Sequence, residues 1–507
     1  MELFVGKGGV GKTTLACATA LAYARSGQKV LLASLDQAHS LGDALGFRFR
    51  HQPGAAPAVA KVQPFLDVIE VDSLALLENR FRQLAIMLSG SGHEHGFDLG
   101  ALDPAELTGL PGVQEILALL EITDFADGGQ WDVIVLDCPP SADMLRIITA
   151  PDTVLGYLDR VWPEHSRALT AGGLDFRRAV LAVTVQEIVA AIAKARDLIA
   201  DHTRTGARLV TAPEHVAIAE SARVRSAAAL LGLRLDAVLV NKVLPEMPGP
   251  NDSGAPHGTR TPDPAAPHGI AEEPRGHGPF GPPVGPETPA AATAAPRTAQ
   301  ASYGPRDVRH PPASNPTVAL FGSDAPDPFA PSTAAVAPPH PAVQWYFNRR
   351  GEQLAVVAEL RKRMSDMPVR VVGHTGAEPV GLGALETLSY AVDASGDWVG
   401  QRPVPMLGSD ADGVLSTPGT GIAEPVVRLE SGTGVQSVFA MRMHLPVVDP
   451  STLQLGRVED DLIVGADGVR RRLRLAPVLR RCTVEAAELD GDQLVIRFRP
   501  DPKVWPK

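Results

Sequence analysis

Near the start of the chain lies the stretch Gly6-Lys7-Gly8-Gly9-Val10-Gly11-Lys12-Thr13-Thr14. A short apolar run at residues 3–5 precedes it, and an Ala- and Leu-rich stretch follows it over residues 12–26. A strand, a glycine-rich turn and a helix in this order bring backbone N–H groups and the positive end of the helix together, which suits the β- and γ-phosphates of a nucleotide. Glycine lets the backbone close around phosphate, because a Cβ would hold it away. The stretch therefore predicts a phosphate-binding loop.

Two side chains of this loop have predicted roles of their own. We expect Lys12 to reach the β- and γ-phosphate oxygens and the Thr13 hydroxyl to ligate Mg²⁺. The other residues that we expect to contact the nucleotide are Gly6, Gly8, Gly9, Val10, Gly11 and Thr14. The loop thus predicts a nucleoside triphosphate as substrate and Mg²⁺ as cofactor.

Lys7 is an additional lysine at the second position of the loop, where an ordinary phosphate-binding loop needs none. A cation there is useful if it crosses to a nucleotide held by a facing subunit. In arginine-finger systems, charge stabilisation of this kind contributes about 10³ to 10⁵ in rate. A solvated surface lysine is the alternative, and we favour a catalytic role for Lys7 in trans.

Two aspartates follow predicted strands. Asp36 comes after the apolar run at residues 29–33, and Asp137 ends the run at residues 133–136, just before Cys138-Pro139-Pro140. Ligands bind at the carboxyl edge of a parallel sheet. We expect Asp137 to hold Mg²⁺ through water and Asp36 to orient the attacking water. An aspartate after a strand often only caps a helix, but the glycine loop at the same edge favours the catalytic interpretation.

Short apolar runs alternate with longer helical stretches up to about residue 244. The runs that we interpret as buried strands are residues 3–5, 29–33, 67–71, 133–136, 208–210 and 237–240. Buried strands separated by helices indicate an α/β fold, a parallel sheet covered by helices on both faces. A helix at residues 344–364, a strand at 369–372 and a helix at 383–390 are expected to complete the same domain.

Two further stretches differ from this domain in composition or periodicity: one lies between its two parts and the other follows it. Residues 245–341 contain 24 of the 46 prolines, interleaved with Gly, Ala, Thr and His. This composition predicts disorder, since it offers too little apolar surface to offset the entropy of ordering. Towards the C-terminus, period-two alternation predicts a small antiparallel β-sandwich. Its expected strands are residues 435–445, 453–458, 461–466, 469–475, 483–489 and 493–498.

Composition argues against several classes of partner. The formal net charge of −11 disfavours binding to nucleic acid, which depends on Lys and Arg. The run Arg470-Arg471-Arg472-Leu473-Arg474 fits an exposed strand face better than a nucleic-acid site. No apolar run has the roughly 18 to 20 residues that a membrane span needs, so stable membrane insertion is not expected. Three scattered cysteines and an N-terminus without room for a signal peptide predict a cytoplasmic protein.

The loop from Gly6 to Thr14, the segment at residues 36–41, the segment at residues 111–115 and Asp137-Cys138-Pro139-Pro140 resemble the ArsA family. This family includes the arsenite-pump ATPase and the guided-entry ATPase for tail-anchored proteins. The late strand at residues 238–241 resembles the family strand whose Asn reads adenine, which implies that Asn241 contacts the base and that ATP is the substrate. The C-terminal sandwich resembles the small heat-shock (α-crystallin) domain attached to some bacterial members.

The resemblance implies a nucleotide-gated homodimer in which Lys7 acts in trans. It places switch I at residues 36–41 and switch II at 137–146, and it implies a helical subdomain with an apolar groove for a client. Groove candidates are residues 81–87 and the stripe Leu181, Val185, Ile188, Ile192 and Ile199. The expected segments are an ATPase domain at 1–244 with its helical subdomain at about 75–200, an insertion at 245–342, the closing part of the ATPase domain at 343–392, a linker at 393–424 and the sandwich at 425–507.

The function that we expect is Mg-dependent ATP hydrolysis that drives dimer opening and closing, coupled to carrying a hydrophobic membrane-protein client. One alternative is the motor ATPase of an arsenite or anion efflux pump, although no cysteine cluster offers the thiolates that a soft metalloid needs. A second is a partition-type positioning ATPase. A third is a nucleotide switch with negligible turnover, since Gln37 replaces the proline usual in switch I.

Overall fold

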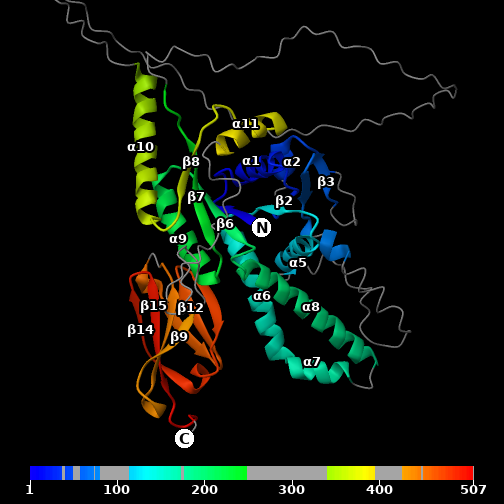
Figure 1. Cartoon of the computed structure of the whole chain (residues 1–507), viewed down its shortest axis with the longest axis vertical. Coiled ribbons are helices and arrows are strands. Elements are labelled where there is room, and N and C mark those ends of the chain that lie inside the picture. Colours follow the sequence, from blue (N-terminus) through cyan, green and yellow to red (C-terminus); the bar gives the residue numbers. More distant parts are fainter. Residues whose placement is uncertain are drawn as a thin grey trace, which may run out of the picture. The chain divides into compact units, whose positions relative to one another are not determined.

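Within the residues that the structure describes, a large, mostly parallel sheet forms from seven strands within residues 2–243 and one strand at residues 369–373 (Figure 1). The computed structural model describes residues 1–36, 40–49, 58–73, 75–79, 113–172, 176–247, 340–393, 425–446 and 449–505. In spatial order, the strands are β3 (Ala60–Gln63), β4 (Leu66–Glu70), β2 (Val30–Ser34), β5 (Val133–Asp137), β1 (Glu2–Gly6), β6 (Gly206–Thr211), β7 (Leu235–Val243) and β8 (Val369–Gly373). Neighbouring strands run parallel except β3, which is antiparallel to β4.

Helices cover both faces of this sheet because its central strands are apolar on both sides. Every residue of β2 and β5 is buried. Since side chains alternate along a strand, Leu3 and Leu31 enter one core and Phe4 and Leu32 enter the other. The second core includes side chains from α1 (Lys12–Arg25), α2 (Ser40–Leu45) and α11 (Leu382–Asp393). The first includes side chains from α5 (Val113–Asp127), α6 (Ser141–Val161), α8 (Phe176–Ala200), α9 (His215–Leu231) and α10 (Pro341–Arg363).

Strand β8 joins the sheet from beyond the proline-rich segment. It pairs in parallel with β7, with Val369 beside Val238 and Val371 beside Val240. Helix α10 also returns to this part of the sheet, because the Gln353 side chain accepts a 2.8 Å hydrogen bond from the Leu244 backbone N–H. The predicted helix and strand beyond residue 343 are therefore both present: β8 is a strand of the sheet, and α10 packs beside it. Residues 248–339 lie outside the described residues.

Two antiparallel sheets make up the C-terminal part. One consists of β14 (Cys482–Asp490), β15 (Gln493–Pro500), β10 (Val438–His444) and β9 (Val426–Ser431), and the other of β11 (Gln454–Val458), β12 (Asp461–Ala466) and β13 (Val469–Arg474). Alternate residues such as Met441, Val464, Ile496 and Phe498 form a common core. All six predicted strands are confirmed, and the structure adds β9, whose largely exposed residues gave no clear alternation.

The apolar stripe predicted on α8 is only partly exposed, so that prediction is wrong in part. Ile192 and Ile199 are buried and belong to hydrophobic cores, whereas Leu181 and Ile188 are 48% and 45% exposed. The stripe therefore serves packing at its C-terminal end, whereas Leu181 and Ile188 leave apolar surface exposed nearer its N-terminal end; α8 also contacts α7 (Glu164–Ala171). The other groove candidate, residues 81–87, lies outside the described residues. None of the described helices has the length and hydrophobicity of a membrane span.

Candidate nucleotide site

The glycine loop joins β1 to α1, as expected. Gly11 precedes the first helical residue in a left-handed conformation (φ 91°), and a Cβ on it would collide with the Asn241 side chain. A Cβ on Gly6 would collide with the Val210 carbonyl oxygen of β6. Both positions thus require glycine for reasons of space as well as conformation. The loop ends at the N-terminus of a 14-residue helix, where free N–H groups and the helix dipole favour an anion.

Two side chains at the end of β7 donate hydrogen bonds to backbone carbonyl oxygens of this loop. The Asn241 amide donates to the Val10 carbonyl oxygen at 2.9 Å, and its own oxygen accepts from the Lys242 N–H at 2.9 Å. Lys242 has a positive φ of 63°, at an irregularity in the pairing of β7 with β8, and its ammonium donates to the Gly9 carbonyl oxygen at 3.0 Å. Asn241 therefore supports the loop directly, and its contact with an adenine base stays a prediction. Lys242 was not predicted as a site residue, although it immediately follows Asn241.

Lys12 and Lys7 occupy different environments. The Lys12 side chain is buried, and its ammonium donates to the Lys7 carbonyl oxygen at 3.1 Å. The Lys7 side chain is 59% exposed, and its ammonium lies 3.6 Å from a carboxylate oxygen of Glu220 on α9. Lys12 is thus held within the loop, whereas Lys7 is at the surface, where a second molecule could reach it.

Asp137 lies at the centre of the site. Parallel pairing places this residue beside Ser34 at the end of β2 and beside Phe4 of β1. One of its carboxylate oxygens accepts from the Thr13 hydroxyl at 2.8 Å and from the Ser34 hydroxyl at 3.3 Å. The other, Oδ1, is buried and has no hydrogen-bond partner. Burial raises the pKa of Asp137 to about 6, against the opposing effects of the Thr13 hydrogen bond and the Lys12 charge.

The oxygens around Asp137 have the chemistry that Mg²⁺ prefers. The Thr13 hydroxyl contacts both Asp137 and the Ser40 hydroxyl, which lies 3.2 Å away at the start of α2. Mg²⁺ commonly binds one or two carboxylates and completes its shell with water and substrate phosphates. A buried, unpartnered carboxylate oxygen next to a threonine hydroxyl at the phosphate loop fits that pattern. Ser34 was not predicted as a site residue, because an isolated serine has no distinctive spacing, and Ser40 was predicted only as part of switch I.

Asp36 lies on the same edge of the sheet. Its backbone N–H donates to the Ser34 hydroxyl at 3.2 Å, and its side chain is half-buried. The negative charge of Asp36 is one of the effects that raise the pKa of Asp137, so the two carboxylates are electrostatic neighbours. The rest of the predicted switch I, residues 37–39, lies outside the described residues, and it resumes at Ser40. The structure thus brings Lys12, Thr13, Asp36 and Asp137 to one edge.

The fold and this site together define a domain of the P-loop nucleoside triphosphatase type, attached to an antiparallel β domain. Comparison with known families agrees: residues 1–253 match the anion-transporting ATPase family, and residues 436–498 match the HSP20-like domain found in ArsA proteins. The chain belongs to the ArsA family of anion-transporting ATPases.

Individual proteins similar to this chain match it over its whole length or over about half of it. Protein Rv2184c of Mycobacterium tuberculosis is 36% identical over 512 residues, which span 100% of this chain and 97% of the relative. A protein of Aquifex aeolicus named "Putative arsenical pump-driving ATPase 1" is 29% identical over 48% of this chain and 63% of its own length. The ATPase GET3 of Candida glabrata is 28% identical over 48% of this chain and 72% of its own length. These relatives support nucleotide-driven activity.

Proposed function

We propose that the protein hydrolyses ATP with Mg²⁺ in the cytoplasm and uses the reaction to open and close a homodimer that carries a hydrophobic membrane-protein client. The observation that supports this most is the buried Asp137 carboxylate, with one oxygen unpartnered and the other bonded to Thr13, directly at the phosphate loop. The ArsA and GET3 relatives support the same chemistry.

Each side chain of the site has a role in the proposed reaction. The loop N–H groups and Lys12 bind the β- and γ-phosphates, with the Lys12 ammonium moving from the Lys7 carbonyl oxygen to phosphate oxygens. Thr13 and Asp137 would hold Mg²⁺, which when bound neutralises charge on the phosphates. Asp36 accepts a hydrogen bond from the attacking water and aligns it with the γ-phosphate.

Dimer closure is proposed from the position of Lys7. In the single chain its ammonium is exposed and pairs with Glu220, a partly exposed carboxylate. Such an exposed pair is worth at most about 1 kcal/mol. Exchanging Glu220 for the more highly charged phosphates of a nucleotide in a second copy is therefore favourable, and it links triphosphate binding to association of the two copies.

The client is proposed to bind the apolar surface of the helical subdomain. Large apolar side chains are exposed on three consecutive helices of this region: Tyr157 and Val161 on α6, Leu169 on α7, and Val180, Leu181, Val183 and Ile188 on α8. These helices are neighbours, since α8 contacts both α6 and α7, and exposed apolar side chains gathered in one region are typical of an interaction site. A hydrophobic segment of a membrane protein has the matching chemistry.

An efflux-pump motor is the second candidate, because arsenical pump-driving ATPases are among the relatives. Metalloid binding would require thiolates. All three cysteines are buried, and burial raises the pKa of each thiol. The cysteine chemistry therefore favours the client carrier over a pump stimulated by a metalloid.

The proposed reaction is tested by measuring phosphate release at saturating Mg-ATP. We expect Asp36→Asn to lower turnover by about 100-fold or more, since it removes the acceptor for the attacking water. Asp197→Asn is a matched control, because Asp197 is an exposed aspartate of α8 whose one ion-pair partner among the described residues is Arg196. An Asp36→Asn enzyme that turns over like the control would refute the hydrolytic mechanism.

A further inference from the structure

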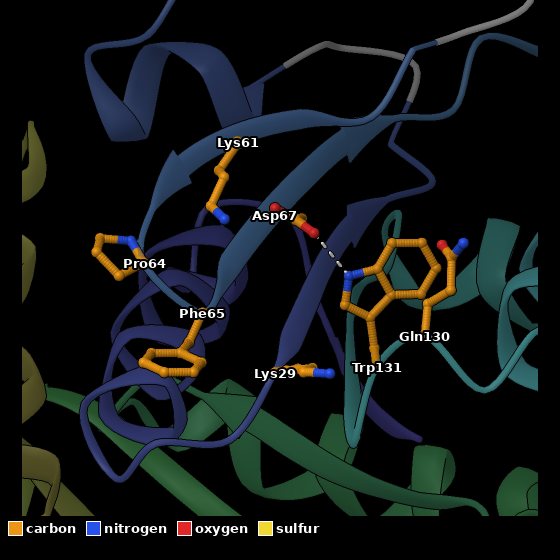
Figure 2. Close-up of a pocket in the computed structure, with 7 residues that line it drawn as sticks. All are labelled: Lys29, Lys61, Pro64, Phe65, Asp67, Gln130 and Trp131. Atoms are coloured by element: carbon orange, nitrogen blue, oxygen red, sulfur yellow. Dashed lines mark hydrogen bonds between the residues drawn. The ribbon is translucent and has the colours of Figure 1, made fainter.

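A pocket (Figure 2) lies at the opposite edge of the sheet from the phosphate loop, where β2, β4 and β5 begin. It has a volume of about 240 Å³, and its lining includes Lys29, Phe65 and Trp131. These residues precede β2, β4 and β5, three neighbouring parallel strands, so they meet where the strands begin. The nucleotide site lies where β2 and β5 end. The pocket is therefore separate from the site described above.

One wall of the pocket is a fixed aromatic ring. The Trp131 indole N–H donates to the Asp67 carboxylate at 2.9 Å, and its ring packs edge-on against Phe125 with centroids 5.6 Å apart. Figure 2 shows the indole beside the pocket with Asp67 at its N–H. A half-buried ring held by both a hydrogen bond and an aromatic contact offers a flat apolar surface at little entropic cost.

The second apolar wall is Phe65, a bulky residue at a turn position where φ is positive. Pro64 and Phe65 form the two-residue turn between β3 and β4, and Phe65 has φ 66°. Glycine or asparagine is the usual residue at such a position, because a Cβ is disfavoured there. The Phe65 ring is nevertheless 49% exposed and lines the pocket. A strained backbone that presents an exposed ring is the kind of outlier from which a binding role can be inferred.

Charged side chains complete the lining. Lys29 and Lys61 both line the pocket, and neither lysine forms an ion pair with a described residue. Figure 2 shows Lys61 projecting from β3 towards the pocket and Lys29 beside Trp131. Asp67 is the one carboxylate of the lining. Within the lining, two lysines face one carboxylate, which favours an anion; outside the lining, the Asp132 carboxylate accepts a 2.8 Å hydrogen bond from the Lys29 backbone N–H.

We propose that this pocket binds a small organic monoanion, a carboxylate on a planar apolar body. Its ring would lie between Trp131 and Phe65, and its carboxylate would pair with Lys29 and Lys61. The open, partly solvated position implies modest affinity, because exposed ion pairs contribute little individually.

Ligand-observed NMR of the full chain tests the proposal, with excess Mg-ADP present to occupy the phosphate loop. The probes are 2-naphthoate and its neutral counterpart 2-naphthamide at low ionic strength. We expect naphthoate to bind about fivefold more tightly than the amide. The double change Lys29→Ala with Lys61→Ala should remove this preference, whereas Lys362→Ala, an exposed lysine of α10, should keep it.

A second variant separates binding from folding. Phe65→Gly removes the ring and places glycine where φ is positive, so we expect both probes to bind about tenfold more weakly while the thermal midpoint stays near that of the unmodified chain. Three results would each overturn the proposal: equal affinity for the two probes, a preference that survives loss of both lysines, or unchanged affinity in Phe65→Gly.

Discussion

The buried charge of Asp137 should make the nucleotide-free protein less stable than it would be without that charge. The carboxyl group has an ordinary pKa of 3.8, and burial raises the pKa of Asp137 to about 6 in the folded chain. Between these values the folded state binds more protons than the unfolded state, so stability falls as pH rises through this window. A difference of roughly two units corresponds to about 3 kcal/mol at neutral pH.

Asp137→Asn tests this reasoning because it removes the charge and keeps the shape. We expect the variant to be more stable than the unmodified chain by about 2 to 3 kcal/mol near pH 8, and we expect the gain to vanish near pH 4. Urea unfolding followed by far-ultraviolet circular dichroism measures the difference. This signal reports chiefly on the nucleotide-binding part, because its α-helices are the strongest contributors and the described C-terminal residues form strands and short 3-10 turns.

With Mg-ADP bound, the unmodified chain should become more stable than Asp137→Asn. A ligand that binds only the folded state stabilises it by an amount that grows with the logarithm of ligand concentration over Kd, and the variant lacks the carboxylate that we propose to hold Mg²⁺. The unmodified chain should therefore gain stability from Mg-ADP, and Asp137→Asn should gain much less. A stability difference that is the same at every pH would refute the argument from buried charge.

Four variants test the nucleotide site and the apolar surface. In light scattering with a non-hydrolysable ATP analogue, Lys7→Ala should abolish the compact dimer, and it should lower turnover by about 10³-fold. Glu220→Gln should strengthen that dimer about two- to fivefold, because it releases Lys7. A protein that stays monomeric under all conditions would contradict both expectations. Asn241→Ala should weaken ATP and GTP binding alike by about tenfold, since it removes support from the loop; loss of preference for ATP alone would instead indicate contact with the base. Leu181→Ser with Ile188→Ser should reduce binding of a Leu-rich apolar peptide in a fluorescence assay and leave basal turnover within about twofold, because both side chains are exposed.

The order of elements in the sheet was largely predictable from the sequence, because fully buried strands stand out as apolar runs between helices. Strand β3 was missed for a physical reason: it is a short edge strand that includes the exposed Lys61, and edge strands carry little apolar patterning. Strand β9 was missed because most of its residues face solvent. Ile192 was misassigned to a surface, since periodicity reveals an apolar stripe but not which neighbour covers it.

For the site, the sequence indicated the residues whose spacing is distinctive. Lys12, Thr13, Asp36 and Asp137 could be assigned to one edge because loop and strand ends identify it. The sequence could not reveal that Asn241 holds the Val10 carbonyl oxygen, because that contact joins positions 231 residues apart. Nor could it show the partner of Lys7, since a surface ion pair leaves no pattern.

The entry of β8 into the sheet means that two separate stretches of chain share one core. Gln353 of α10 bonds to the end of β7, and the Arg25 guanidinium of α1 lies 4.0 Å from the centre of the Tyr390 ring of α11. After a protease cut between residues 247 and 340, β8 would still pair with β7. The two strands would then belong to separate fragments, so their pairing would depend on fragment concentration. The link between the halves acts as a tether that sets effective concentration, so two co-expressed fragments should reassemble into one nucleotide-binding sheet whose yield depends on dilution.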